Sequence, residues 1–192
     1  MPADLIAFSA DRRISGAIPL ADDRLSDMLN SVPRIVMRNA SVVDLVRGGE
    51  PRPAELTLAV GAIVACVAGG RRGTDTRRVR TGVRRVRIGL TRFVVTGFIH
   101  ESPSQPLPSG STDPAVVLAG RDLLVALTDA TITYDLADVP TTEHGETILV
   151  NRAHATWIDL DDAAGDSSDS DLIQGRERVY HAAVAKDFTG AH

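Results

Sequence analysis

The chain has 192 residues, of which 43% are hydrophobic and 24% are charged, and its formal net charge is −4. This composition supports a buried core and excludes disorder by composition. The negative charge argues against a protein that coats nucleic acid over its whole surface. The length is compatible with one large β domain or with two small units.

The single cysteine, Cys66, lies in the apolar run AIVACVA, which predicts a buried thiol rather than a disulfide or a metal ligand. The first residues, MPADLIAFSADRR, show no basic region followed by a long apolar stretch, and no apolar window approaches about 18 residues. We therefore expect a cytoplasmic protein without a membrane segment. The strong preference for arginine over lysine suggests a bacterial source.

Four stretches of the first third are short, β-branched and bounded by turn formers, which predicts strands. They are LIAF (5–8), RRISGAIPL (12–20), RIVMRNASVVDL (34–45) and ELTLAVGAIVACVA (55–68).

Between the second and third stretches, DDRLSDMLNSVPR predicts a short helix. Leu25, Met28 and Leu29 share one face of it, and Asp22 or Asp23 is positioned to cap it. We expect this helix to plug one end of a β-barrel, with partner binding as the alternative.

The next segment, residues 71–92, holds nine arginines and one acidic residue. Dense arginine attracts phosphate, but no aromatic residue lies inside the segment to stack on single-stranded bases. Pairing with the acidic stretch 159–171 is the first interpretation, a solvated linker the second and nucleic-acid contact the third. The candidate binding residues are Arg71, Arg72, Arg77, Arg78, Arg80, Arg84, Arg85 and Arg87.

The stretches of the first third recur in the same order further along the chain, which predicts a duplicated β unit. They read VRIGL with RFVVTGFI, then LLVALTDATITYDL, then ETILVNRAHATWIDL. The matched positions are Gly16 with Gly97, Asn39 with Asp129, Glu55 with Glu146, and Val67 with Ile158. The alternative is that unrelated strands look alike because all-β proteins reuse valine, isoleucine and threonine.

The matched glycines and turn residues have a physical reading. A glycine inside a strand marks a bulge or a bend, so Gly16 and Gly97 are candidate bends. Asn39 and Asp129 stand between apolar runs, where a short side chain bonds its own backbone and tolerates positive φ. We expect a turn at each.

This order of elements resembles the Sm-like small β-barrel, which is also SH3-like in outline. In the first copy the resemblance rests on Arg12-Arg13, Gly16, Asn39 and LAVGAIVACV; in the second it rests on Gly97, Asp129 and LVNRAHATWI. The chain also resembles uncharacterised bacterial β proteins with RLSDFLN and PLTDA stretches, here RLSDMLN (24–30) and LTDA (127–130). These resemblances imply a fold and no activity. The second copy has a proline- and serine-rich loop where the first has RLSD.

Sequence signatures of catalysis are absent from the chain. There is no HExxH, no GxSxG, no phosphate-binding glycine loop and no EF-hand spacing in the acidic stretch. His144 and His154 lie near acidic residues without a metal-ligand spacing. We therefore expect no enzyme activity, no catalytic residue, no cofactor and no metal.

The resulting prediction is a mainly β protein of two tandem small β-barrels with a short helix and a C-terminal helical tail. Residues 1–70 form the first barrel unit, 71–85 an arginine-rich linker, 86–160 the second barrel unit, and 161–192 an acidic linker with the helical tail. We expect a non-catalytic binding or assembly module that self-associates into a homo-oligomer or binds a protein partner. The alternative is an Sm-like RNA-binding protein that uses the arginine segment.

Overall fold

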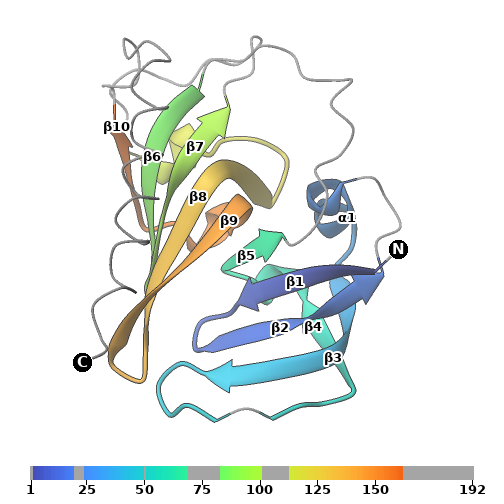
Figure 1. The fold of residues 1–192 in the computed structure, drawn as a ribbon. Coiled ribbons are helices and arrows are strands. Elements are labelled where there is room, and N and C mark those ends of the chain that lie inside the picture. Colours follow the sequence, from blue (N-terminus) through green and yellow to red (C-terminus); the bar gives the residue numbers. More distant parts are fainter. Residues whose placement is uncertain (1, 20–23, 50, 69–82, 101–112, 162–192) are drawn as a thin grey trace, which may run out of the picture. The chain divides into compact units, whose positions relative to one another are not determined.

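The computed structural model describes residues 2–19, 24–49, 51–68, 83–100 and 113–161 (Figure 1). The chain is mainly β, with one antiparallel sheet and few helices, and Met1–Asp161 form a single compact unit. Among the described residues no helix is long and apolar enough to cross a membrane. The predicted Asp22 and Asp23 caps, most of the arginine segment and the acidic and helical tail lie outside the described residues.

The first half of the sheet comes from residues 2–68. Its elements are β1 (Pro2–Phe8), β2 (Arg12–Pro19), α1 (Leu25–Ser31), β3 (Arg34–Asp44), β4 (Glu55–Ala59), the 3₁₀ turn η1 (Val60–Ala62) and β5 (Ala65–Ala68). Met28 and Leu29 of α1 are buried, as the apolar face of the predicted helix requires.

The second half, residues 83–161, has the same order of elements. They are β6 (Val83–Leu90), β7 (Phe93–His100), α2 (Pro114–Val117), β8 (Leu124–Leu136), β9 (Val139–Asn151), η3 (Arg152–His154) and β10 (Trp157–Asp161). Strands β8 and β9 form a long, curved hairpin (Figure 1). Strand β6 begins three residues inside the segment predicted as linker.

Helix α2 stands where we expected only a loop in the second copy. Asp113 caps it, because the Asp113 carboxylate accepts a hydrogen bond from the Ala115 amide. Pro114 follows at the first helical position, which its fixed φ suits. The two halves therefore both carry a helix between their second and third strands, although α2 is only four residues long.

The strands pair in the order β10-β6-β7-β8-β9-β5-β1-β2-β3-β4. Each half contributes its fifth, first, second, third and fourth strand in that same order, and the halves meet where β5 pairs with β9. The pairing ends at β10 and β4, so the described sheet is not closed. Two separate closed barrels are not observed, and that finer arrangement stays a prediction.

A bulge occurs at the same place where the second and third strands of each half pair, with two residues of the third strand opposite one glycine of the second. The register between β2 and β3 shifts between Ser15 and Ala17, at Gly16, and the register between β7 and β8 shifts between Thr96 and Phe98, at Gly97. At Gly97, an added Cβ would lie 2.6 Å from the Cβ of Ala130. Glycine is used here because the neighbouring strand approaches too closely for a side chain.

Asn39 and Asp129 also occupy matching positions. Their φ angles are 49° and 48°, in the left-handed region that Asn and Asp tolerate better than other side chains. Both residues lie inside a strand, β3 or β8, and not at its end. They therefore bend a continuous strand where we expected a turn between two strands.

The register also corrects two of the matched positions by one residue. Leu5 pairs with Gly16 and Ala68, and Val86 pairs with Gly97 and Leu160. Ala68 therefore corresponds to Leu160, and the counterpart of Ile158 is Cys66 rather than Val67. The same reasoning through β3 and β8 makes Thr147, and not Glu146, the counterpart of Glu55.

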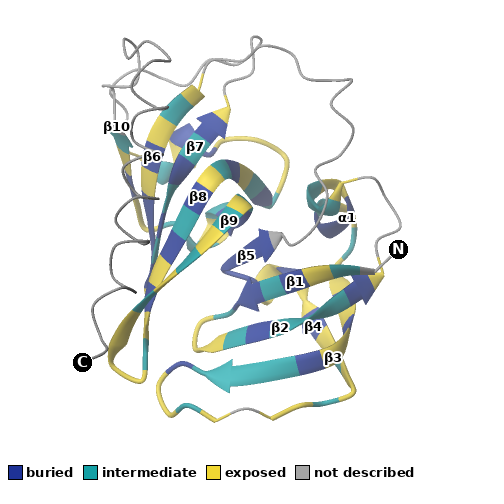
Figure 2. Ribbon diagram, viewed as in Figure 1, coloured by how far each residue is buried: buried dark blue, intermediate teal, exposed yellow. Residues whose placement is uncertain are grey.

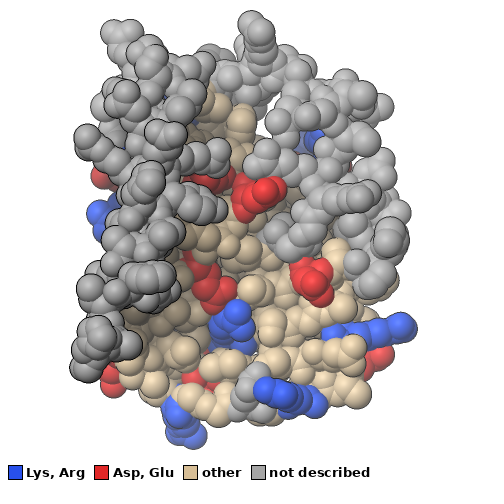
Figure 3. Space-filling model, viewed as in Figure 1, with Lys and Arg blue, Asp and Glu red and all other residues tan. Residues whose placement is uncertain are grey.

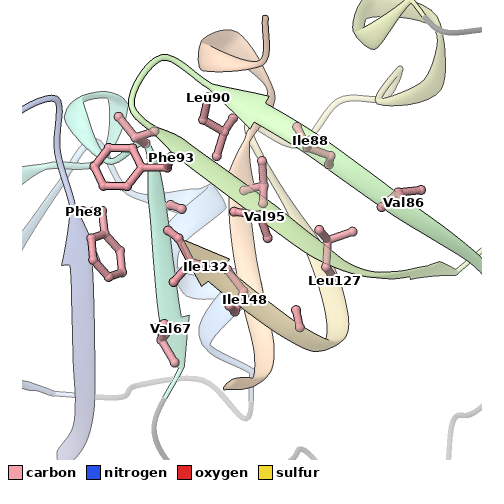
Figure 4. Packing of buried hydrophobic residues seen from close by; sticks show 14 of the residues in the cluster. Phe8, Val67, Val86, Ile88, Leu90, Phe93, Val95, Leu127, Ile132 and Ile148 are labelled. Atoms are coloured by element: carbon pink, nitrogen blue, oxygen red, sulfur yellow. The ribbon is translucent and has the colours of Figure 1, made fainter. Parts of the chain in front are cut away.

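The buried side chains form two clusters, which use opposite faces of the sheet where the halves meet. The first cluster, mostly from residues 5–66, includes Cys66 and Leu149. The second cluster, mostly from residues 86–158, includes Ala65, Val67, Ile148 and Val150, of which Figure 4 labels Val67 and Ile148. Figure 2 shows buried positions on strands of both halves. Alternate side chains of a strand point to opposite faces. Strands β5 and β9 are therefore shared by both cores.

Junction between the halves and the free sheet edges

The junction is built on a short backbone ladder. Ala65, Cys66 and Val67 of β5 lie opposite Val150, Leu149 and Ile148 of β9. These six side chains are buried or nearly so. The halves therefore meet as two strands of one sheet with a layer of buried side chains on each face.

Two asparagine side chains fasten the end of this ladder at which Ala65 pairs with Val150. Asn151 is fully buried; its Nδ2 donates to the Ile63 carbonyl at 2.8 Å, and its Oδ1 accepts from the Ala153 amide at 3.0 Å. Asn30 of α1 makes a two-point contact with the backbone of Leu124 at the start of β8, at 2.8 and 3.1 Å. Because each amide uses both its donor and its acceptor, its burial carries no unsatisfied polar atom at these contacts.

A charged pair crosses the junction as well. The Arg13 Nε of β2 donates to Glu143 Oε1 of β9 at 2.6 Å, and a second guanidinium nitrogen lies 3.3 Å from Oε2. Tyr134 of β8 donates its hydroxyl to the same Oε1 at 2.5 Å. The Arg13 and Glu143 side chains are 24% and 19% exposed. This two-point geometry at partial burial is the stronger kind of ion pair.

The electrostatics of this group follow from its partners. Burial opposes the charge of Arg13, but the hydrogen bond to Glu143 and its negative charge outweigh burial and raise the pKa of Arg13. Burial first, and then the hydrogen bond to the Glu143 carboxylate, raises the pKa of Tyr134. Both groups keep their protons at neutral pH, which suits a structural link rather than proton transfer.

An aromatic trio adjoins the charged pair through Tyr134, and Figure 4 shows its other two rings, Phe8 and Phe93. Phe8 of β1 packs against Phe93 at 5.4 Å between ring centroids and against Tyr134 at 5.1 Å. Phe93 and Tyr134 are 6.0 Å apart. Phe8 belongs to the first half and is fully buried in the second cluster, so it anchors one half in the core of the other.

The two edge strands β4 and β10 each have one neighbour among the described strands, β3 and β6 respectively. On β4, Glu55, Thr57 and Ala59 are exposed, while Leu56 is only partly buried. On β10, Trp157 is 40% exposed. Edge strands present backbone groups that can pair with another strand.

One cross-strand pair has its large and small residues on opposite strands in the two halves. In the first half, Phe8 of β1 lies opposite Ala65 of β5; in the second half Gly89 of β6 lies opposite Trp157 of β10. A Cβ on Gly89 would lie 2.0 Å from the Trp157 ring. The aromatic residue of this pair therefore lies on the first strand of the first half, β1, but on the fifth strand of the second half, β10.

The arginine segment is described in part. Arg84, Arg85 and Arg87 lie on β6, whereas Arg71, Arg72, Arg77, Arg78 and Arg80 lie outside the described residues. Arg85 is opposite Asp161, and Arg87 is opposite Asp159. The Arg87 guanidinium also lies 5.6 Å from the Trp157 ring centre.

This placement brings the start of the predicted acidic stretch next to the end of the arginine segment. Cross-strand neighbours of opposite charge attract each other weakly when they are exposed. Figure 3 shows described basic and acidic side chains interspersed over the visible face. Arg85 and Arg87 therefore lie opposite aspartates in the strand register, and the interpretation of the arginine segment as a whole stays a prediction.

Metal-ligating residues do not converge in the part of the chain that the structure describes, where no group of three His, Cys, Asp or Glu side chains could hold an ion. His154 contacts the Gly61 carbonyl at 3.1 Å. Cys66 is fully buried, and burial raises the pKa of its thiol to about 12. An unreactive, protonated thiol results.

Sequence reasoning missed the residues of the junction. The sequence pattern marks Arg13 only within the Arg12-Arg13 pair of the resemblance, and it does not single out Tyr134, Glu143, Asn30 or Asn151. A signal existed for Asn151, because it stands between an apolar run and the next polar stretch. Arg13 and Glu143 are 130 residues apart, and no local pattern links them.

Comparison with known protein families, with curated proteins and with solved structures finds no match to this chain. The resemblance to the Sm-like barrel therefore stays an expectation from the sequence motifs.

Proposed function

We propose that this protein is a non-catalytic assembly module that associates with further copies of itself. The observation that supports the proposal is the β5·β9 junction, where two halves of like topology already associate edge to edge within one chain. A fold that uses this contact once and retains two edge strands is suited to use it again.

The finer architecture belongs to the same proposal. The like order of elements, the matching bulges and the matching left-handed residues favour two copies of one small barrel-like unit of the Sm-like kind. In each half the fifth strand pairs with the first, which supports the proposal of a barrel-like unit. A repeated unit explains why the chain contains two sets of edges of the same kind.

The test is the solution mass of the full chain. Sedimentation velocity or light scattering across a concentration series is expected to show a mass above that of the 20.4 kDa chain that rises with concentration. A single monomeric species at the highest concentrations would contradict the proposal.

RNA binding is the second candidate, and one observation favours it. Arg85 and Arg87 are exposed on β6, and Arg87 lies next to the exposed Trp157 ring; cationic and aromatic groups together bind single-stranded nucleic acid. The opposed aspartates weaken this candidate. A filter-binding titration with a mixed RNA pool at low salt decides it: retention that falls steeply with salt supports RNA binding, and no retention removes it.

A further inference from the structure

The chain contains both sides of one type of contact twice, and within the described strands only one pair of sides is in use. The junction joins the fifth strand of the first half, β5, to the fourth strand of the second half, β9. The counterparts of these strands are β10, the fifth strand of the second half, and β4, the fourth strand of the first half. These counterparts are the two strands that end the described sheet.

We propose that β10 of one chain pairs with β4 of a second copy, antiparallel and in the register of the β5·β9 junction. This inference rests on the proposed self-association and adds the surface, the orientation and the register. The contact joins two different edges, so it is head-to-tail and not a symmetric pairing of like edges.

The register follows from the structural correspondence. Strand β5 corresponds to β10, with Ala68 at the position of Leu160. The counterparts of Ala65, Cys66 and Val67 are therefore Trp157, Ile158 and Asp159. The counterparts of Val150, Leu149 and Ile148 are Leu58, Thr57 and Leu56. The predicted opposite pairs are therefore Trp157 with Leu58, Ile158 with Thr57, and Asp159 with Leu56 of the second copy.

The alternation of side chains supports this register. At the junction, Ala65 and Val67 turn away from the core of their own half and enter the core of the other. Their counterparts Trp157 and Asp159 are exposed, while Ile158 between them is buried in its own half. On β4, Leu56 and Leu58 face the first cluster. The exposed Trp157 would then cover the Leu58 side of that cluster in the second copy.

The contact between chains lacks two of the polar links that strengthen the junction. The counterpart of Asn151 is Ala59, and the counterpart of Arg13 is Val94. Where β5 has the apolar Val67, β10 has Asp159, which would lie opposite Leu56 of the second copy. A charged residue at this position disfavours tight pairing. The contact is therefore weaker than the junction, and the association depends on protein concentration.

A head-to-tail contact has a consequence for the size of the assembly. A chain that joins through its β4 edge still offers its own β10 edge to a further chain. Growth therefore does not stop at two chains. Such contacts end in a closed ring or continue as a filament. The number of chains is set by the rotation between successive copies.

Paired cysteines test the register. In Leu56→Cys/Asp159→Cys the two thiols of adjacent copies face each other, whereas in the control Thr57→Cys/Asp159→Cys they point to opposite faces of the sheet. The native Cys66 is fully buried and stays in place. Under mild oxidation we expect the first variant to form a ladder of covalent multimers and the control to form far less. Each single-cysteine variant is expected to remain uncross-linked.

The outcomes separate the two proposals. A monomeric wild-type chain would overturn self-association itself. An oligomeric wild-type chain with equal cross-linking in both double variants would overturn the edge pairing alone, as would efficient cross-linking of either single variant, which indicates a symmetric contact.

A charge on the edge gives a second readout that needs no new thiol. Thr57→Lys places an ammonium group opposite the buried Ile158 of the second copy, so we expect the assembly to dissociate at concentrations where the wild type is oligomeric. Thr57 is exposed in the single chain, so its fold is expected to persist by circular dichroism. The matched control is Ala126→Lys, at an exposed position of β8, which has neighbours on both sides. Equal mass of the Thr57→Lys and control proteins would overturn the proposal.

Discussion

Single residues set the curvature of this sheet. Gly16 and Gly97 each lie at a bulge. On the neighbouring strand an alanine, Ala40 or Ala130, lies against each glycine. A small residue facing a glycine lets two strands approach more closely than side chains normally allow. The same pair at the same place in both halves makes this the most local feature that the halves share.

Adding one carbon at the bulges is expected to destabilise the protein in a definite order. Gly97→Ala forces a contact at 2.6 Å with the Ala130 Cβ, and Gly16→Ala forces one at 3.0 Å with the Arg38 carbonyl. We expect Gly97→Ala to lower the free energy of unfolding by about 1–3 kcal/mol, and Gly16→Ala to lower it less. Denaturant unfolding measures both. Gly61→Ala, where a Cβ meets nothing within 4 Å, is the control; an equal loss there would contradict the argument.

Tyr134 predicts a pH dependence above neutrality. Its pKa is raised from the ordinary value of 10.0 by burial and by its bond to Glu143. The stability contributed by the protonated phenol is thus complete below pH 10 and is lost as the pH rises above it, because the unfolded chain ionises first. Tyr134→Phe should lower the free energy of unfolding at pH 7 by about 1.5–3 kcal/mol.

The same variant should also make unfolding less steeply dependent on pH above about 10. Urea unfolding of both proteins between pH 7 and 11 gives the two slopes, and parallel curves over that range would refute a raised pKa at Tyr134. Cys66 ionises late in both proteins and cancels in the comparison.

At the scale of elements, the junction decides how the halves are held. A backbone ladder of three residue pairs is short for an interface between two β units. The Arg13–Glu143 pair, the Phe8 ring and the two asparagines add contacts on both sides of it. These contacts are specific to the junction, because their counterparts at the free edges differ.

A double-mutant cycle measures the coupling free energy between Arg13 and Glu143. Glu143→Ala leaves the partly buried Arg13 and Tyr134 without their acceptor, so we expect the free energy of unfolding to fall by about 1–3 kcal/mol. Arg13→Met should show a coupling with it of about 0.5–2 kcal/mol. His144→Ala, an exposed neighbour on the same strand, should change stability by less than about 0.5 kcal/mol. Additive effects of the two changes would show that the pair contributes nothing of its own.

At the scale of the whole molecule, the two cores are not independent. Phe8, Leu45, Val64, Ala65 and Val67 come from the first half and are buried in the second cluster. In the other direction, Leu124 and Leu149 come from the second half and are buried in the first cluster. Each half therefore depends on its neighbour to cover part of its apolar surface.

A fragment of residues 1–68 is therefore expected not to fold alone as a soluble monomer. It exposes the whole β5 edge together with Phe8 and Val67, which are buried in the cluster formed mostly by the second half. Circular dichroism and amide chemical-shift dispersion, with the full chain as reference, provide the measurement. A monomeric fragment with native-like dispersion would mean that the first half is self-sufficient.

Much of the fold could be predicted from local features of the chain. The alternation of β-branched residues marked the strands, and the apolar face of residues 25–29 marked α1. The glycines and the Asn39 and Asp129 positions marked the bends. The register of the last strands was predicted one residue out, because Val67 and Ile158 look alike while Cys66 and Ile158 do not. A single-residue slip exchanges the two faces of a strand.

The sequence by itself determined where this chain is extended, where it bends and which side chains are apolar, because those properties depend on neighbouring residues. Only the tertiary structure decided that β5 joins β9, that Arg13 meets Glu143, and that β4 and β10 end the described sheet. Strand pairing is made by backbone groups that every residue carries, so its partners have no signature in the side chains. Which edges are used and which are left is therefore settled only when the strands are assembled.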